Sequence, residues 1–142
     1  MSTLDVINPA TGKNLASLPA DDARSVRAKF AAARAAQPAW AARPLRARIA
    51  IIRDFRAAIV AHTEELARTL TAETGKPIAQ ARSELQGLLP RLDFFLKETP
   101  RALRIETVLA DRKAGLTEQI GWEPLGVIAN ISAWNYPYYV GS

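Results

Sequence analysis

The run "VIANI", residues 127–131, limits the possible folds most strongly, because it is short, nearly all apolar and preceded by the turn signal "EPLG", residues 123–126. These features are typical of a strand buried on both faces of a parallel sheet. Such a strand needs hydrogen-bonding neighbours on its edges, and the sequence contains no second run of the same kind. We therefore expect an α/β protein in which this is the first strand of a sheet that continues outside these residues.

The positions of the aromatic residues also indicate a structure that continues outside these residues. All three tyrosines and one of the three tryptophans lie in the final nine residues, directly after the apolar run. Such a cluster normally packs against other residues, and nothing follows it in the sequence. We expect that the polypeptide is cut within a structural unit.

Composition excludes several classes of protein. A length of 142 residues with 49% hydrophobic and 23% charged residues is typical of a globular domain. The absence of cysteine excludes disulfides and a thiol nucleophile within these residues, and the single His62 excludes a histidine metal cluster. No secretory segment begins the chain and no run of about 18 apolar residues occurs, so we expect a cytoplasmic protein with no membrane partner and no metal.

The net charge of +5 raises the alternative of nucleic-acid binding, because basic residues crowd into "RPLRARIAIIRDFR", residues 43–56. In a helix, however, Arg46, Arg53 and Arg56 spread around the polar side of an Ile/Leu stripe. No aromatic stacking motif is interleaved with them. A solvated helix face is favoured, and we expect no nucleic-acid partner. A nucleic-acid binder would instead lose affinity steeply with salt.

Four helices are predicted before Pro100. Asp21 or Asp22 caps the first helix, Pro44 suits the first turn of the second, and Thr63 is the expected N-cap of the third. The apolar face of the first helix is expected to carry the following residues at helical spacing: Val26, Phe30, Ala33 and Trp40.

The third helix is expected to stop at Gly75, and a fourth helix is expected from about Ile78. Pro90 should kink or split that fourth helix, and Pro100 should end it. The period then changes from helical to alternating, so "RIETVL", residues 104–109, and "GLTEQIGW", residues 115–122, predict a hairpin.

The segment "AWNYP", residues 133–137, carries the candidate chemistry. It brings the amide of Asn135 to the carboxyl end of the predicted strand, where open α/β sheets bind ligands. A neutral NH₂ donor can stabilise an oxygen that gains negative charge, and loss of one such donor costs about 2.7–4 kcal/mol of barrier. The alternative is that Asn135 satisfies local backbone groups in a turn.

The segment "EPLGVIANISAWNYP", residues 123–137, resembles the E-P-x-G-V-x-x-x-I-x-P-W-N-F/Y-P segment of the NAD(P)-dependent aldehyde dehydrogenase superfamily. "NPATGK" at 8–13, "QPAW" at 37–40 and "ETGKPIAQARSEL" at 73–85 also resemble that family, in the same order and at similar separations. The resemblance therefore runs along nearly the whole chain.

The resemblance implies a fold of three parts: a Rossmann-like cofactor-binding domain, a catalytic domain, and a bridging hairpin that joins subunits into a homodimer or homotetramer. Residues 1–105 would be the helical N-terminal part of the cofactor-binding domain. Residues 106–124 would form the bridging hairpin, and 125–142 the first buried strand and the Trp-Asn loop. The catalytic domain would be absent from these residues.

The resemblance also implies roles for single residues. Asn135 matches the family's side-chain half of the oxyanion hole. Four residues would line the site of NAD or NADP: Ile131, Ser132, Ala133 and Trp134. Three would border the tunnel by which the aldehyde enters: Tyr136, Tyr139 and Val140. This sequence departs from the family in having Ala133 where most members have proline, and Glu84 matches a frequent family glutamate, to which we assign a structural role as an exposed helix carboxylate.

In the family, a cysteine thiolate attacks the aldehyde, hydride passes to the cofactor, and a glutamate activates the water that hydrolyses the thioester. Of the family's catalytic residues, this sequence contains only the oxyanion-hole asparagine, as Asn135. We therefore expect an N-terminal fragment of an oxidoreductase that converts an aldehyde to a carboxylic acid, inactive as a 142-residue chain. The alternative is a stand-alone helical module that binds a partner through the aromatics at 134–139.

Overall fold

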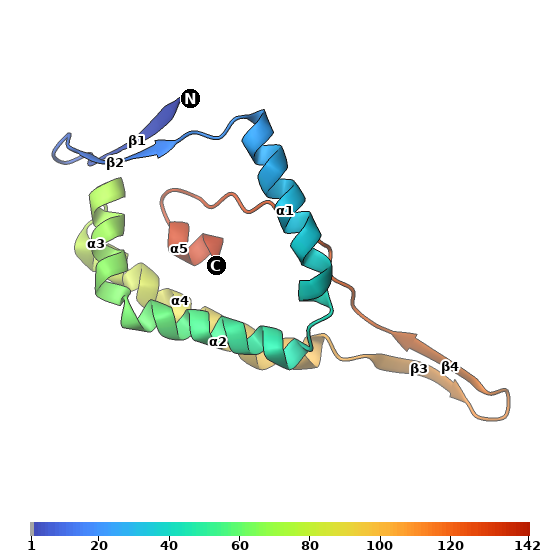
Figure 1. Ribbon diagram of the computed structural model, residues 1–142. Coiled ribbons are helices and arrows are strands. Elements are labelled where there is room, and N and C mark those ends of the chain that lie inside the picture. Colours follow the sequence, from blue (N-terminus) through green and yellow to red (C-terminus); the bar gives the residue numbers. More distant parts are fainter. Residues whose placement is uncertain (1) are drawn as a thin grey trace.

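A computed structural model describes residues 2–142 (Figure 1). Its elements, in chain order, are β1 (Thr3–Ile7), β2 (Asn14–Pro19), α1 (Ala23–Ala41), α2 (Leu45–Ala61), α3 (Thr63–Thr74), α4 (Ile78–Ala102), β3 (Glu106–Asp111), β4 (Leu116–Ile120) and α5 (Pro137–Gly141). The expected α/β class is confirmed, with two separate two-stranded sheets, β1–β2 and β3–β4.

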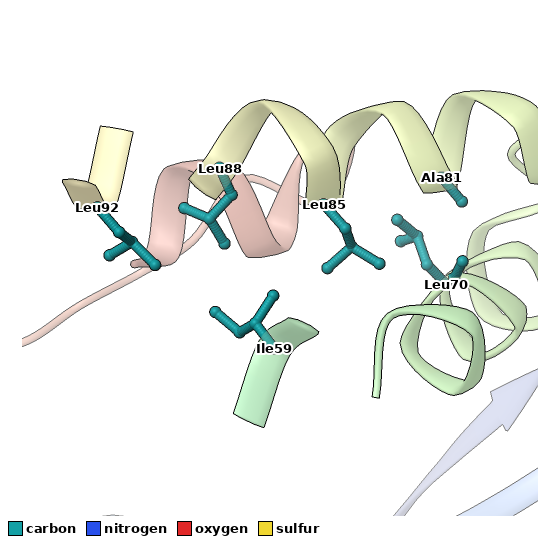
Figure 2. Close-up of a cluster of buried hydrophobic side chains, with 7 residues drawn as sticks. Ile59, Leu70, Ala81, Leu85, Leu88 and Leu92 are labelled. Atoms are coloured by element: carbon teal, nitrogen blue, oxygen red, sulfur yellow. The ribbon is translucent and has the colours of Figure 1, made fainter. Parts of the chain in front are cut away.

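The core lies where α4 packs against α2 and α3. Leu85, Leu88 and Leu92 recur at helical spacing along α4 and are nearly or fully buried. They meet Ile59 of α2 and Leu70 of α3 in one cluster (Figure 2). Each buried leucine contributes about 1.5–3 kcal/mol through removal of apolar surface from water. The long helix α4 is therefore the element on which the other helices are placed.

Helix α1 begins as predicted. Asp22 Oδ1 accepts a hydrogen bond of 2.8 Å from the Ser25 amide, and Ser25 Oγ accepts one of 2.9 Å from the Asp22 amide. This capping box satisfies two N–H groups that a helix start otherwise leaves free. The apolar face of α1 is largely exposed among residues 2–142, since Val26 and Phe30 are 54% and 57% exposed. Only its last part meets other helices in the described chain, where Trp40 lines a pocket with residues of α2 and α4.

Of the two predicted ends of α3, the first is wrong and the second is confirmed. The predicted N-cap, Thr63, is wrong: His62 occupies that position, and the Thr63 hydroxyl donates to the Ile59 carbonyl at 2.8 Å. The preceding helix offers this acceptor because only His62 separates α2 from α3. The predicted stop at Gly75 is confirmed, since Gly75 adopts φ +73° and its amide donates to the Thr71 carbonyl.

Helix α4 is continuous through Pro90, so the predicted split does not occur, and it ends at Ala102 rather than at Pro100. A proline in a helix removes the N–H that would bond the carbonyl four residues earlier, here that of Gln86. Pro90 and Gln86 are both exposed, which leaves that carbonyl open to water. The opposite face of α4 carries the buried leucines, and their packing keeps the helix continuous through the proline.

The hairpin predicted after the helices is confirmed. β3 and β4 are antiparallel, with Thr107 opposite Gln119 and Asp111 opposite Leu116, and Gly115 in the connecting turn has φ +66°. Figure 1 shows this hairpin extending away from the helices, and all residues of both strands are exposed. The opening segment forms a second antiparallel hairpin, β1–β2, beside α3.

The buried strand predicted at 125–131 is not formed. Residues 121–133 are neither helix nor strand, and Leu125 and Ile131 are each 93% exposed. A central strand is stable only where neighbouring strands accept and donate its backbone hydrogen bonds. Neither hairpin pairs with this segment among residues 2–142, so its apolar sequence alone does not produce a strand.

Candidate functional site

The Trp-Asn turn immediately precedes α5. The Tyr136 amide donates to the Ala133 carbonyl at 3.3 Å, so that Trp134 and Asn135 form the turn between them. Asn135 is exposed, and its side-chain amide makes no hydrogen bond to other residues among 2–142. The expected delivery of this amide by a buried strand is therefore wrong here; a turn at the start of a short helix carries it instead. The amide is free to donate to a ligand.

The segment that enters the turn is tied to α5 by two side chains. Ser132 Oγ donates to the Pro137 carbonyl and Asn130 Nδ2 donates to the Gly141 carbonyl, both at 2.8 Å. Any side chain at Gly141 would conflict with this arrangement, because a Cβ there would lie 2.9 Å from Ser132 Oγ. Residues 130–141 therefore form one closed local unit around the turn.

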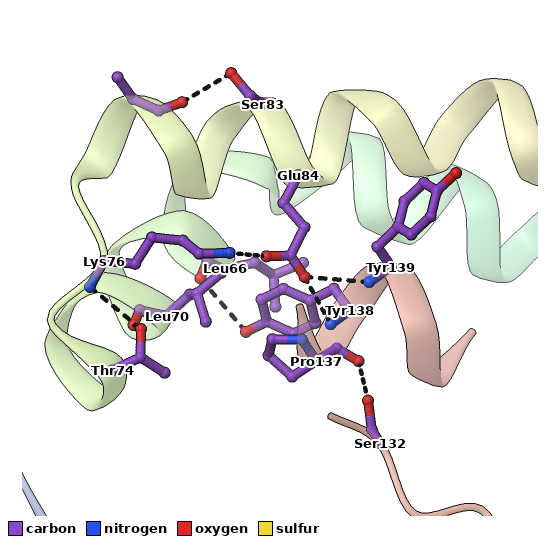
Figure 3. Close-up of polar contacts among 11 residues, drawn as sticks. Leu66, Leu70, Thr74, Lys76, Ser83, Glu84, Ser132, Pro137, Tyr138 and Tyr139 are labelled. Atoms are coloured by element: carbon purple, nitrogen blue, oxygen red, sulfur yellow. Dashed lines mark hydrogen bonds and ion pairs between the residues drawn. The ribbon is translucent and has the colours of Figure 1, made fainter. Parts of the chain in front are cut away.

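Glu84 of α4 holds this unit against the helices, and its predicted exposure is wrong. Its side chain has no solvent exposure, and Oε1 accepts hydrogen bonds from the amides of Tyr138 (2.9 Å) and Tyr139 (3.1 Å). Figure 3 shows the carboxylate between α4 and α5. The sequence held a signal that was missed: Glu84 lies between Ala81 and Leu88, on the face of α4 that is apolar and buried.

Lys76 completes this contact. Its ammonium Nζ lies 2.6 Å from Glu84 Oε2 and 3.8 Å from the centre of the Tyr136 ring, and the lysine side chain is only 11% exposed. A cation over an aromatic face is attracted by the ring, more strongly where water is excluded. The Lys76–Glu84 ion pair therefore contacts the chain on both sides of Pro137.

Of the three residues predicted to border a substrate tunnel, two line the same pocket. Tyr136 and Tyr139 line a pocket of about 260 Å³ together with residues of α4, including Glu84 and Gly87. Val140 is 50% exposed and is not among the residues lining that pocket in the described chain. The pocket thus lies on the α4 side of the Trp-Asn turn.

Tyr138 packs into the core beside α3, and its hydroxyl donates to the Leu66 carbonyl at 3.4 Å. Burial, followed by the nearby charges of Glu73 and Glu84, raises the pKa of the Tyr138 phenol above its ordinary value of 10.0. Tyr138 and Tyr139 are half-buried, so they are not the free aromatic surface that the interaction-module alternative requires.

The residues predicted to bind a cofactor differ in their surroundings. Ile131 and Trp134 are 93% and 81% exposed, Ala133 accepts the bond that closes the turn, and the Ser132 hydroxyl is used within the loop. Over residues 2–142, no three His, Cys, Asp or Glu side chains lie close enough to hold a metal ion. Nor does that part of the chain include a helix with the length and apolar character needed to cross a bilayer.

The whole chain, residues 1–142, matches the family model described as the aldehyde dehydrogenase family. The chain therefore belongs to that family, as its sequence motifs indicate.

Individual relatives agree. The chain is 39% identical over 138 residues to the 3,6-anhydro-alpha-L-galactose dehydrogenase of Streptomyces coelicolor, a match that covers 95% of this chain and 27% of that protein. It is 36% identical to the NADP⁺ succinate-semialdehyde dehydrogenase of Escherichia coli K12, with 94% of this chain and 27% of that protein covered. The chain thus spans about 27% of the length of these relatives.

Solved structures share the fold. The succinate-semialdehyde dehydrogenase of Burkholderia pseudomallei superposes with a TM-score of 0.86 at 32% identity, covering 98% of this chain and 28% of that one. An aldehyde dehydrogenase of Brucella melitensis biovar abortus gives a TM-score of 0.88 at 29% identity, with the same two coverages. The arrangement of residues 2–142 is therefore that of a region of aldehyde dehydrogenase structures.

Proposed function

We propose that this chain is the N-terminal part of an enzyme that oxidises an aldehyde to a carboxylic acid with NAD⁺ or NADP⁺. The match of all 142 residues to the aldehyde dehydrogenase family carries the proposal. The local structure supports it, because the Trp-Asn turn presents a free amide at a place held by the buried Glu84.

Asn135 is proposed as a catalytic residue that donates to the aldehyde oxygen. When a nucleophile adds to the carbonyl carbon, that oxygen gains negative charge, and a fixed neutral donor lowers the energy of the charged state. The amide is exposed and has no competing hydrogen bond among residues 2–142. The nucleophilic thiol of the family lies outside this sequence, which contains no cysteine.

The residues before Asn135 fit a nicotinamide cofactor. Ile131 and Trp134 offer exposed apolar surface for a flat ring, and no charged side chain stands between them in "ISAW". Ser132 and Ala133 would hold the backbone beside that ring in place through the bonds that close the loop. When bound, NAD⁺ or NADP⁺ supplies the acceptor for hydride.

Tyr136, Tyr139 and Val140 are proposed to border the route of the aldehyde. The first two already line one pocket, and Val140 follows them on the exposed side of α5. Relatives of this chain are named for succinate semialdehyde and 3,6-anhydro-alpha-L-galactose, so both aldehydes belong in a substrate survey.

The division into parts is also proposed. Residues 1–105 and 125–142 would belong to a cofactor-binding domain, and 106–124 would form a hairpin that pairs subunits into a homodimer or homotetramer. The β3–β4 hairpin supports this, because it projects from the helices (Figure 1). Apolar side chains such as Val108 and Ile120 are also exposed on its two strands. A cytoplasmic location remains a prediction.

The test uses the complete enzyme, and compares wild type with Asn135→Ala while reduced nicotinamide is measured over a panel of aldehydes. Loss of the donor should lower kcat about 10²- to 10³-fold, with little change in the KM of the cofactor. The control is Asn14→Ala, which removes an exposed asparagine of the β1–β2 hairpin, outside the Trp-Asn turn. The proposal is wrong if the wild type oxidises no aldehyde of the panel, or if Asn135→Ala retains full activity.

A further inference from the structure

The Asn135 amide has no bond of its own that fixes it among residues 2–142, so its position depends on the residues that follow it. Directly after it, the Tyr136 ring lies against the Lys76 ammonium, at 3.8 Å from its centre. Beyond Pro137, the amides of Tyr138 and Tyr139 donate to Glu84. Figure 3 shows the contacts after that proline, where Glu84 of α4 meets the amides of Tyr138 and Tyr139.

The Lys76–Glu84 contact is built as a fixed anchor. The carboxylate has no solvent exposure and receives three donors, two backbone amides on Oε1 and the ammonium on Oε2. A buried charge is stable only when it is paired and its lone pairs are satisfied, and hydrogen bonds to an ionised group are short and strong. A shift of α5 would remove two of these three donors from the buried carboxylate, so the start of α5 has one preferred position.

We propose that Glu84 and Lys76 are positioning residues for Asn135: their buried ion pair fixes the start of α5, and thereby sets where the Asn135 amide stands relative to the aldehyde oxygen. This inference rests on the proposed function. Both residues act through Asn135 and touch no reacting atom. A misplacement of about 1 Å in such a donor can lower a rate about 10²-fold.

The test is a double-mutant cycle in the complete enzyme, combining Glu84→Gln with Asn135→Ala. Glutamine has the shape of glutamate and keeps one oxygen for the two tyrosine amides, but it turns an NH₂ group toward the Lys76 ammonium. Glu84→Gln alone should lower kcat about 10- to 100-fold and leave the KM of the cofactor within about threefold. In the Asn135→Ala background the same change should lower kcat by less than about twofold.

Asp93→Asn is the matched control. Asp93 also lies on α4 and also forms an ion pair, with Arg56 of α2, but that pair is exposed and is not part of the anchor. It should leave kcat within about twofold in both backgrounds. If Glu84→Gln does not fold, as judged by circular dichroism, Glu84→Asp replaces it. This variant keeps the charge and shortens the side chain by one methylene group. It should give the same loss of kcat, and only in the enzyme that retains Asn135.

A second readout does not depend on catalysis. Hydrogen exchange at the Tyr138 and Tyr139 amides should become faster in Glu84→Gln and stay unchanged in Asp93→Asn. An equal loss of kcat with and without Asn135, or no loss at all, overturns the inference and leaves the proposed function in place. A wild-type enzyme that oxidises no aldehyde overturns the proposed function and this inference with it, even where the exchange result holds.

Discussion

At the scale of residues, the candidate site depends on a few polar groups placed where water is excluded. Glu84 satisfies backbone amides of α5, and Tyr138 fills the space between α5 and α3 with its hydroxyl on the Leu66 carbonyl. Buried polar groups of this kind fix one arrangement, because every alternative leaves a donor or acceptor without a partner. The Trp-Asn turn itself stays exposed and is held by its neighbours.

Tyr138 should make stability fall at high pH. Burial raises the pKa of its phenol above 10.0 in the folded protein, so the folded state keeps a proton that the unfolded state releases. The stabilisation is fully present below the unfolded pKa and is lost as pH rises through the folded pKa. Urea unfolding between about pH 9 and pH 12 should show a decline that is smaller in Tyr138→Phe than in wild type.

Tyr136→Phe is the control for this measurement, because Tyr136 is 48% exposed. It should show the same decline as wild type. If the decline in Tyr138→Phe matches that of the wild type, the phenol of Tyr138 is not its source.

The sequence predicted some of these residues and could not predict others. One short motif in the sequence singles out Trp134 and Asn135, whose roles stay a prediction, whereas the burial of Glu84 was not predicted. The amides that donate to it lie 54 and 55 residues away, and no local sequence pattern predicts hydrogen bonds over such a separation. The helical position of Glu84 on the apolar face of α4 was the one local signal.

At the scale of elements, local chemistry set most boundaries correctly. Asp22 begins α1 and Gly75 ends α3 as predicted, because caps act on groups within a few residues. Predictions that depend on distant contacts failed: packing keeps α4 intact at Pro90, and residues 125–131 lack the neighbours that a strand requires. Propensity is a weak guide wherever such contacts decide.

Replacing Gly75, which ends α3, and Gly87, which lies within α4, by alanine should change the free energy of unfolding in opposite directions. Gly75→Ala should lower the free energy of unfolding by about 1–2 kcal/mol, because a side chain disfavours the left-handed conformation. The new Cβ would also lie 3.0 Å from Pro9 Cγ. Gly87→Ala, in the interior of α4 with its nearest atom 3.9 Å away on Tyr139, should raise it by about 0.5–1 kcal/mol. Urea unfolding of both variants measures the change in the free energy of unfolding. Equal changes of the same sign would contradict the two predictions.

At the scale of the whole molecule, the 142 residues bury little of their apolar surface. Among residues 2–142, the buried residues of the core lie on α2, α3 and α4, with Tyr138 and Tyr139 of α5 packed against them, and α1 contributes no buried side chain. Trp122 is 65% exposed and Leu125 93% exposed. Apolar surface of this extent is typical of a face that packs against further protein.

The isolated 142-residue polypeptide should therefore unfold without a sharp transition. We expect a broad thermal melt by near-ultraviolet circular dichroism, binding of a hydrophobic dye, and no NAD(P)-linked oxidation of an aldehyde. The complete enzyme, measured beside it, should melt cooperatively and bind little dye. A sharp melt of the isolated polypeptide without dye binding would favour the interaction-module alternative.

The anchor on Glu84 has a consequence for the order in which the protein folds. It joins residues 54 positions apart in the chain, so its formation must overcome the entropy of closing a long loop, while α3 and α4 are adjacent in sequence. The helices should therefore assemble early and the turn that carries Asn135 should be fixed late. A polypeptide with its helical scaffold complete would still lack an ordered turn until Glu84 captures the amides of α5.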